Sequence, residues 1–293
     1  MYSQFYVRVS GGFSNQLLQL SLALYLSERA RVSLDISDFT YYDIHSGFIG
    51  LTGLRSQRIS SIRSFSKLFG KILSRASTIL PARSFAFFHD YRAISYDMST
   101  CRSPLAYFNG TWMSPVFYGH NGCFKLSCLL SDIIANMYEA TDPLALSADL
   151  KSNPLLSSSA LVHLRQGDYA VGRYRSLLYL LHFTDYYDKA LARARALGVD
   201  RVYLISDAPL ETYLSLFPDR FRDFFVIDTG QMDSISILRL MVNCGVLIGA
   251  NSSLSWIASL LRAGGSFSML PKRWFFEGQW CNTSHVHHKA SFV

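Results

Sequence analysis

The residues ALVHLRQGDY, at positions 160–169, are the most informative about the fold. Its first five residues, 160–164, are apolar except for one histidine, which predicts a buried strand. A cluster of polar residues around Gly167 follows that strand directly. In open α/β sheets, ligands bind at the carboxyl ends of the strands, so this stretch predicts both an α/β fold and the position of a site.

The chain beyond this strand alternates regularly between helix and strand patterns. The predicted elements are a helix over 184–197, a strand over 201–205, a helix near 209–216, a strand over 224–227, a helix over 234–242, a strand over 246–248, a helix over 253–261 and a strand over 267–270. Four passages from strand to helix in succession are typical of a doubly wound nucleotide-binding half.

The N-terminal end has the same pattern. A strand is predicted over 5–9, and Gly11 and Gly12 interrupt it. A helix over 15–29 follows, with Ser14 or Asn15 as its expected cap, and then a second strand over 32–36. This βαβ opening predicts a second parallel sheet.

Length and composition agree with two domains. The chain has 293 residues, 49% hydrophobic and 17% charged, which excludes a disordered or coiled-coil protein. A segment rich in Pro, Ser and Asn at 142–159 is the predicted linker, so we expect domains at 1–150 and 151–293. Neither a membrane-spanning stretch nor a secretory signal is recognisable, which predicts a cytoplasmic protein.

The net charge of +7 favours an anionic partner. The sequence lacks zinc-finger spacing and dense basic arms, so a phosphorylated small molecule is favoured over nucleic acid. An insertion near 55–80 carries basic residues every four positions, at Arg63, Lys67, Lys71 and Arg75. This predicts a basic amphipathic helix, either a solvated surface helix or a peripheral contact with the anionic inner membrane surface.

Two segments carry the chemistry of a diphosphate site. Arg165 offers a planar fork that binds a phosphate through two hydrogen bonds, unless it pairs with Asp168. The segment GANSSLSW, residues 249–256, follows another strand and begins a helix. Helix starts bind anions, and Ser252 and Ser253 add hydroxyl donors, although plain N-capping by one serine is the alternative.

No metal is expected at this site. The sequence contains no D-x-D pair of the kind that holds a divalent cation at a sugar-nucleotide diphosphate. The C-terminal Cys281, His285, His287 and His288 lie outside any strand end and are interpreted as an exposed polar tail. The five cysteines form no C-x-x-C pair and are interpreted as buried thiols.

Five segments together resemble the α-1,2-fucosyltransferases of glycosyltransferase family 11, almost from end to end. They are GGFSNQL at 11–17, FNGTWMSP at 108–115, VHLRQGDY at 162–169, NSSLSW at 251–256 and PKRWF at 271–275. The resemblance implies a GT-B fold, with two Rossmann-like halves whose parallel sheets face a central cleft. It also implies inverting, metal-independent transfer of L-fucose from GDP-fucose, without a cofactor, to the 2-hydroxyl of a galactose-terminated oligosaccharide or glycolipid.

The sequence departs from that family at Gln166, where the family has a second arginine. Another GDP-sugar glycosyltransferase and a catalytically inactive glycan-binding relative therefore stay as alternatives. A nucleic-acid partner is not expected.

The motifs and the resemblance together suggest roles for single residues. Arg165 stabilises the leaving diphosphate, Asp168 is the general base or holds Arg165, and Asn15 orients the acceptor hydroxyl or the phosphate. Asp207 accepts hydrogen bonds from guanine, or alternatively caps a helix. The expected donor-binding residues are His163, Gly167, Tyr169, Asp207, Asn251, Ser252, Ser253, Gly11 and Gly12.

Overall fold

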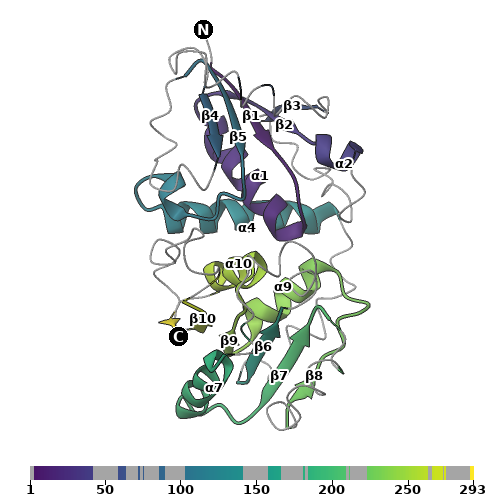
Figure 1. Ribbon diagram of the computed structural model, residues 1–293, viewed down its shortest axis with the longest axis vertical. Helices are drawn as coiled ribbons and strands as arrows, with labels where there is room; N and C mark the ends of the chain where they lie inside the picture. Colours follow the sequence, from purple (N-terminus) through teal and green to yellow (C-terminus); the bar gives the residue numbers. More distant parts are fainter. Residues whose placement is uncertain are drawn as a thin grey trace. The chain divides into compact units, whose positions relative to one another are not determined.

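The computed structural model divides into two compact units, Met1–Asp142 and Pro143–Val293. Their boundary lies at the start of the predicted linker. The structure describes residues 3–41, 59–63, 72, 75, 86–89, 103–140, 158–165, 181, 184–208, 211, 223–262, 266–272, 274 and 291–293. Each unit contains one sheet with its own helices (Figure 1). We describe the two units separately.

The first unit is built on a five-stranded parallel sheet with the strand order β3-β2-β1-β5-β4. Its strands are β1 (Gln4–Arg8), β2 (Arg31–Asp35), β3 (Ile59–Arg63), β4 (Ala86–His89) and β5 (Leu105–Asn109). Its helices include α1 (Phe13–Ser27), α2 (Ser37–Tyr41), the 3-10 helix η2 (Pro115–Tyr118) and α4 (Gly122–Ala140). The predicted βαβ opening is confirmed as β1, α1 and β2.

Helix α1 is buried over its whole middle, from residue 16 to residue 26. Its N-cap is Gly12, so the expected cap at Ser14 or Asn15 is wrong. The amide of Gln16 already donates to the Gly12 carbonyl oxygen at 3.1 Å. Ser14 and Asn15 therefore lie within the first helical turn and not before it. The helix start has no side-chain capping hydrogen bond from its N-cap residue, because glycine has no side chain.

The predicted basic helix near 55–80 is wrong at its beginning. Ile62 and Arg63 belong to strand β3, where they pair with Leu34 and Asp35 of β2. Ile59 and Ile62 are three positions apart, a spacing that favours a helix, but pairing with β2, with a register shift between Val32 and Ser33, makes this segment a strand. Ile72 and Arg75 are helical and exposed, whereas Lys67 and Lys71 lie outside the described residues.

The second unit has a six-stranded parallel sheet with the order β11-β10-β9-β6-β7-β8. Its strands are β6 (Ala160–Leu164), β7 (Val202–Ser206), β8 (Phe225–Val226), β9 (Val246–Ile248), β10 (Phe267–Leu270) and β11 (Ser291–Phe292). Its helices include α7 (Tyr186–Ala196), α9 (Ser234–Asn243) and α10 (Ser253–Leu261). Counted along this unit, the order is that of the doubly wound nucleotide-binding fold. The prediction of an α/β protein with two parallel sheets is therefore confirmed.

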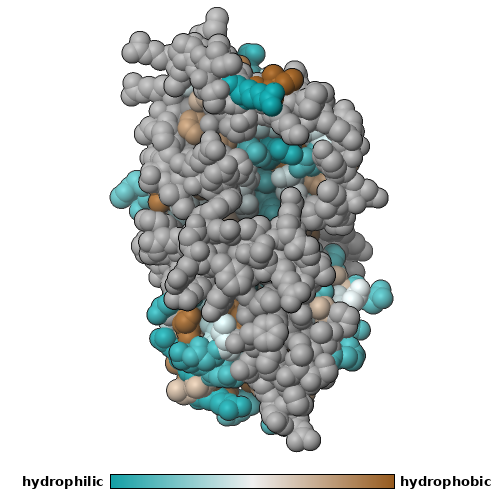
Figure 2. Space-filling view, in the orientation of Figure 1, coloured by the Kyte–Doolittle hydropathy of each residue, from teal (hydrophilic) through white to brown (hydrophobic). Residues whose placement is uncertain are grey.

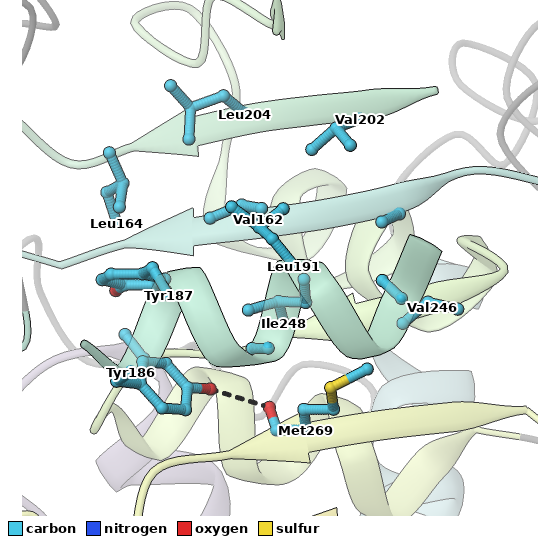
Figure 3. Close-up of a cluster of buried hydrophobic side chains, with 14 of the residues drawn as sticks. Val162, Leu164, Tyr186, Tyr187, Leu191, Val202, Leu204, Val246, Ile248 and Met269 are labelled. Carbon is cyan, nitrogen blue, oxygen red and sulfur yellow. Dashed lines mark hydrogen bonds between the residues drawn. The ribbon is translucent and has the colours of Figure 1, made fainter. Parts of the chain in front are cut away.

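Strand β6 lies at the centre of this sheet and is buried throughout. Alternate side chains point to opposite faces of a strand, so Val162 and Leu164 face one side and His163 faces the other. Val162 packs in one cluster with Tyr187 and Leu191 of α7 (Figure 3). The opposite face is therefore the one on which His163 can meet helix α10.

Helix α7 is also tied to the strands by a buried tyrosine. The hydroxyl of Tyr186 lies 2.6 Å from the Gly249 carbonyl oxygen and 3.1 Å from that of Met269 (Figure 3). Burial raises the pKa of this hydroxyl well above its ordinary value, so it stays protonated and able to donate. It fixes the ends of β9 and β10 against α7.

A buried arginine closes the end of helix α9. Arg262 is only 3% exposed, and its guanidinium donates to the carbonyl oxygens of Met241 at 2.7 Å and Gly245 at 2.8 Å. It also lies 3.0 Å from the Sγ atom of Cys244, which is a free thiol. Hydrogen bonds to buried carbonyl oxygens compensate the desolvation of the charge.

The interpretation of the cysteines as buried thiols holds for Cys244 and is wrong for Cys128. Cys244 is buried, whereas Cys128 on α4 is exposed and Cys123 is half-buried. All three are free thiols. Cys101 and Cys281 lie outside the described residues.

The described surface mixes hydrophilic and hydrophobic side chains, as one face of it shows (Figure 2). Phe124 of α4 and Phe225 of β8 are the most exposed aromatic side chains in the described ranges. Within those ranges, no helix has both the length and the apolar character that crossing a bilayer requires.

Candidate functional site

The strand register brings three chain segments to one edge of the second sheet. Val162 of β6 pairs with Ile248 of β9, and Leu164 pairs with Ser206 of β7. The segments that follow these three strands therefore leave the sheet together at its carboxyl edge. Sequential strands progress in one direction from β6 to β8 and in the other from β9 to β11, so the topological switch point lies between β6 and β9.

Arg165 comes directly after β6 at this edge. Its Nη1 atom lies 2.6 Å from Oδ2 of Asp207, which comes directly after β7, and both side chains are partly exposed. From sequence, Asp168 is the alternative partner expected for Arg165. Asp168 lies outside the described residues, as do Gly167 and Tyr169, so these three predictions stay predictions.

His163, two residues before Arg165, is buried on the opposite face of β6 from α7. Its Nδ1 atom lies 2.7 Å from Oγ of Ser255 in α10, and the same Oγ accepts a hydrogen bond from the amide of Ala250 at 3.0 Å. Burial, and after it the nearby positive charge of Arg165, lowers the pKa of His163 to about 3. The imidazole is therefore neutral near pH 7 and joins β6 to the start of α10.

Helix α10 begins at the switch point with Ser252 as its N-cap. The Oγ atom of Ser252 accepts from the amide of Leu254 at 3.3 Å, so the N-capping alternative for this serine is confirmed. Ser253 is the first residue of the helix. Asn251 is buried, and its Nδ2 atom donates to the Trp274 carbonyl oxygen at 3.1 Å, which fixes the loop before the helix.

Gly249 allows the chain to turn tightly from β9 into this loop. A Cβ atom at this position would lie 2.6 Å from Cδ2 of Leu270 and 2.9 Å from Cβ of Ser255. Both distances are below van der Waals contact, so a larger residue would push α10 away from the strand. The glycine therefore keeps Ser255 within reach of His163.

These features together favour an anion at the carboxyl edge. The start of α10 carries the positive end of the helix dipole, and Arg165 leaves the neighbouring strand with a permanent positive charge. His163 adds no charge of its own, because its imidazole is neutral. The arrangement suits a phosphate or diphosphate better than a carboxylate-rich metal site.

Three further predicted residues lie in the first unit. Gly11 has a left-handed backbone with a φ of 77°, and a Cβ atom there would lie 2.8 Å from Nδ2 of Asn15. Gly12 is the N-cap of α1, with nothing within 4 Å of its Cβ position. These residues therefore form a tight turn between β1 and α1, with Asn15 packed across it.

The loop around these glycines is held in place by two buried glutamines, Gln16 and Gln19. Nε2 of Gln16 donates to the Gly11 carbonyl oxygen at 2.9 Å. Gln19 accepts from the amide of Ser10 at 2.8 Å and donates to the Gly110 carbonyl oxygen at 2.8 Å. Because Ser10 follows β1 and Gly110 follows β5, Gln19 connects the loops on either side of the switch point of the first sheet.

A buried carboxylate in the first unit is used for structure. Asp35 at the end of β2 accepts from the Tyr107 hydroxyl at 2.5 Å and from the Ser37 amide and hydroxyl at 3.0 and 2.6 Å. Burial and the nearby Asp35 charge raise the pKa of Tyr107 far above its ordinary value. All of these bonds hold β2, β5 and α2 together.

Sequence reasoning missed Ser255, although it lies within the quoted segment 249–256. Its spacing from Ser252 places it one turn into α10, but only the pairing of β6 with β9 brings it to His163. Among the residues that the structure describes, no group of three or more His, Cys, Asp or Glu side chains could hold a metal ion. The C-terminal histidines lie outside that part of the chain.

No protein-family model matches the sequence, and no curated protein matches it either. Solved structures with a similar arrangement include a variant of FUT1 from Arabidopsis thaliana in complex with GDP, with 12% identity, a TM-score of 0.46, and coverage of 93% of this chain and 71% of that one. POFUT1 in complex with GDP-fucose has 12% identity, a TM-score of 0.44, and coverage of 92% and 98%.

The heptosyltransferase WaaC of E. coli with ADP is also similar, with 10% identity, a TM-score of 0.41, and coverage of 99% and 92%. The similar structures thus include glycosyltransferases crystallised with different nucleotides. At these scores the likeness is one of arrangement alone and assigns neither a donor nor an acceptor.

Proposed function

We propose that this protein is a GDP-sugar glycosyltransferase, and specifically an α-1,2-fucosyltransferase that transfers L-fucose from GDP-fucose to the 2-hydroxyl of a galactose-containing glycan. The observation that carries the proposal is the position of Arg165 at the switch point of a doubly wound sheet, on the strand next to the serine-capped start of α10. A positive side chain after one strand and a helix start after the neighbouring strand can each bind one phosphate group of a diphosphate. The five family-like segments of the sequence support fucose as the sugar.

The reaction would form a bond from the acceptor oxygen to C1 of fucose while the bond from C1 to the β-phosphate oxygen breaks. The electron pair of that bond leaves with GDP, and the acceptor proton passes to a carboxylate, for which Asp168 is the candidate. Negative charge grows on the leaving diphosphate. Arg165, the hydroxyls of Ser252 and Ser253, and the dipole of α10 would stabilise that charge in place of a metal ion.

The direct test is to incubate the purified protein with GDP-fucose and a panel of galactosides, with and without EDTA. We expect release of GDP that needs a galactoside, is insensitive to EDTA, and gives a fucose linked to the 2-position by NMR. Product formation that EDTA abolishes would contradict the metal-independent mechanism.

Parallel reactions with other GDP-sugars decide the two alternatives. Transfer from another GDP-sugar, but not from GDP-fucose, would assign the protein a different donor on the same site. Glycan binding without GDP release from any donor would identify the inactive glycan-binding relative suggested by Gln166.

A further inference from the structure

The ion pair of Arg165 and Asp207 joins two residues that the proposed function places at different parts of the donor. Arg165 would bind the diphosphate, and Asp207 would accept hydrogen bonds from the Watson–Crick edge of guanine. In a guanine nucleotide the ribose separates these two groups. In the structure, however, Nη1 of Arg165 and Oδ2 of Asp207 are 2.6 Å apart. Binding of the donor in these two roles would draw the two side chains toward different groups of the nucleotide.

From this conflict we infer that Asp207 and the donor diphosphate compete for the Arg165 guanidinium, and that the guanine base compensates Asp207 for the loss of its partner. The inference rests on the proposed function and makes Asp207 a specificity-determining residue. A half-buried carboxylate that loses its cation is destabilised unless new hydrogen bonds replace it. Guanine supplies two N–H donors through N1 and its 2-amino group, whereas adenine presents no matching pair.

The backbone around Asp207 allows such an exchange. The amide of Asp207 lies 3.4 Å from the Leu164 carbonyl oxygen, and the amide of Ala208 donates to Oγ of Ser206 at 3.1 Å. The Thr229 hydroxyl donates to the Ser206 carbonyl oxygen at 2.9 Å. None of these three bonds uses the Asp207 carboxylate, so each of them can persist when that carboxylate changes partner.

Side-chain exposure is consistent with exchange as well. The side chain of Arg165 is 31% exposed and that of Asp207 is 19% exposed. An anion can therefore reach the guanidinium from solvent, while the carboxylate is buried enough for its charge to matter. Water does not fully screen the attraction within a pair at this depth, and the pair is exposed enough to exchange partners.

The test is calorimetric titration of the full chain with three probes: inorganic pyrophosphate, GDP and ADP. The variant is Asp207→Asn, and Asp200→Asn is its matched control because it makes the same change at an exposed position before the same strand, at the other edge of the sheet. We expect pyrophosphate to bind Asp207→Asn at least about fivefold more tightly than the parent, since a competing charge is removed. The preference for GDP over ADP should fall toward unity, and Asp200→Asn should match the parent for all three probes.

A third variant, Asp207→Glu, keeps the negative charge and therefore separates the effect of losing the charge from an effect on folding. It should bind pyrophosphate as weakly as the parent, with a thermal unfolding curve like that of the parent. Unchanged or weaker pyrophosphate binding by Asp207→Asn would overturn the inference, and weaker binding would instead make Asp207 a positioning residue for Arg165.

A separate variant, Arg165→Met, tests the phosphate site of the proposed function. Arg165→Met should lose pyrophosphate binding whatever the role of Asp207. If Arg165→Met binds pyrophosphate as the parent does, the phosphate site itself is wrong. If only the Asp207 variants behave unexpectedly, the phosphate site stands and the competition is rejected.

Discussion

The imidazole of His163 and the hydroxyl of Ser255 form a buried hydrogen bond of 2.7 Å between strand β6 and helix α10. Because Oγ of Ser255 also accepts from the amide of Ala250, one hydroxyl joins the strand, the loop after β9 and the helix. Arg165 follows His163 by two residues, and Ser252 caps the same helix. The bond therefore sets the distance between the two halves of the proposed phosphate site.

Ser255→Ala should destabilise the second unit. The substitution leaves two buried polar groups, Nδ1 of His163 and the amide of Ala250, without this partner, and such a loss costs about 1–3 kcal/mol in the free energy of unfolding. Ser259→Ala is the control, because Oγ of Ser259 donates only to the Trp256 carbonyl oxygen in the same helix. Urea unfolding should show the larger loss for Ser255→Ala, and equal losses would show that the link between strand and helix adds nothing.

Stability should fall with acid in a way that depends on His163. Burial, followed by the charge of Arg165, lowers the pKa of His163 to about 3 from its ordinary 6.5. The unfolded chain therefore binds a proton between pH 6.5 and pH 3 that the folded protein does not. The stabilisation is complete above pH 6.5 and is lost as the pH falls toward 3.

We expect His163→Gln, which cannot titrate, to flatten this dependence. Between pH 6 and pH 5 the free energy of unfolding of the parent should fall more steeply than that of the variant, by about 1 kcal/mol per pH unit. Urea unfolding at several pH values measures both slopes. Parallel slopes would mean that the imidazole is hydrated in the folded protein.

Arg165→Ala should lower turnover with GDP-fucose by at least about a hundredfold, because removing one preorganised donor to developing charge costs roughly 2.7–4 kcal/mol. Arg201→Ala is the matched control: Arg201 is exposed and lies before β7, at the opposite edge of the sheet. GDP release measures the effect, and circular dichroism checks the fold. Near-normal turnover in Arg165→Ala would remove this residue from the site.

Gly12→Ser should raise stability and lower activity. Gly12 has the extended backbone of an N-cap, no cap hydrogen bond, and open space around its Cβ position, so a serine hydroxyl can cap α1 and add a few tenths of a kcal/mol. If the substrate approaches this backbone, the added side chain lowers kcat/KM. Gly12→Ala is the control, since it adds the Cβ without a cap and should lower the Tm. A more stable and fully active Gly12→Ser would place the substrate elsewhere.

Much of the second unit could be predicted from sequence. The bounds of β6, β9, α10 and β10 are those expected, because each is a compact apolar run followed by glycine, proline or a polar residue. Strand β3 was missed because Ile59 and Ile62 have a helical spacing, and only the pairing with β2 makes residues 59–63 a strand. A short run at a sheet edge carries too few buried positions to reveal its period.

The contacts within the site could be predicted less well. Arg165 and Asp207 were each expected at a strand end, but their pairing depends on the register of β6 with β7, which no local pattern contains. The same holds for His163 and Ser255 across β6 and β9. Sequence patterns thus locate the residues at the edge of the sheet, and strand register decides which of them meet.

The thiol of Cys244, enclosed with the Arg262 guanidinium between α9 and β9, gives the second unit a built-in reporter. Burial raises its pKa, so little reactive thiolate forms while the helix and strand stay together. Exposed Cys128 in the first unit should be alkylated at once and supplies an internal reference. The rate at which a reagent modifies Cys244 would therefore time the local opening of this helix–strand junction, without any label introduced by mutation.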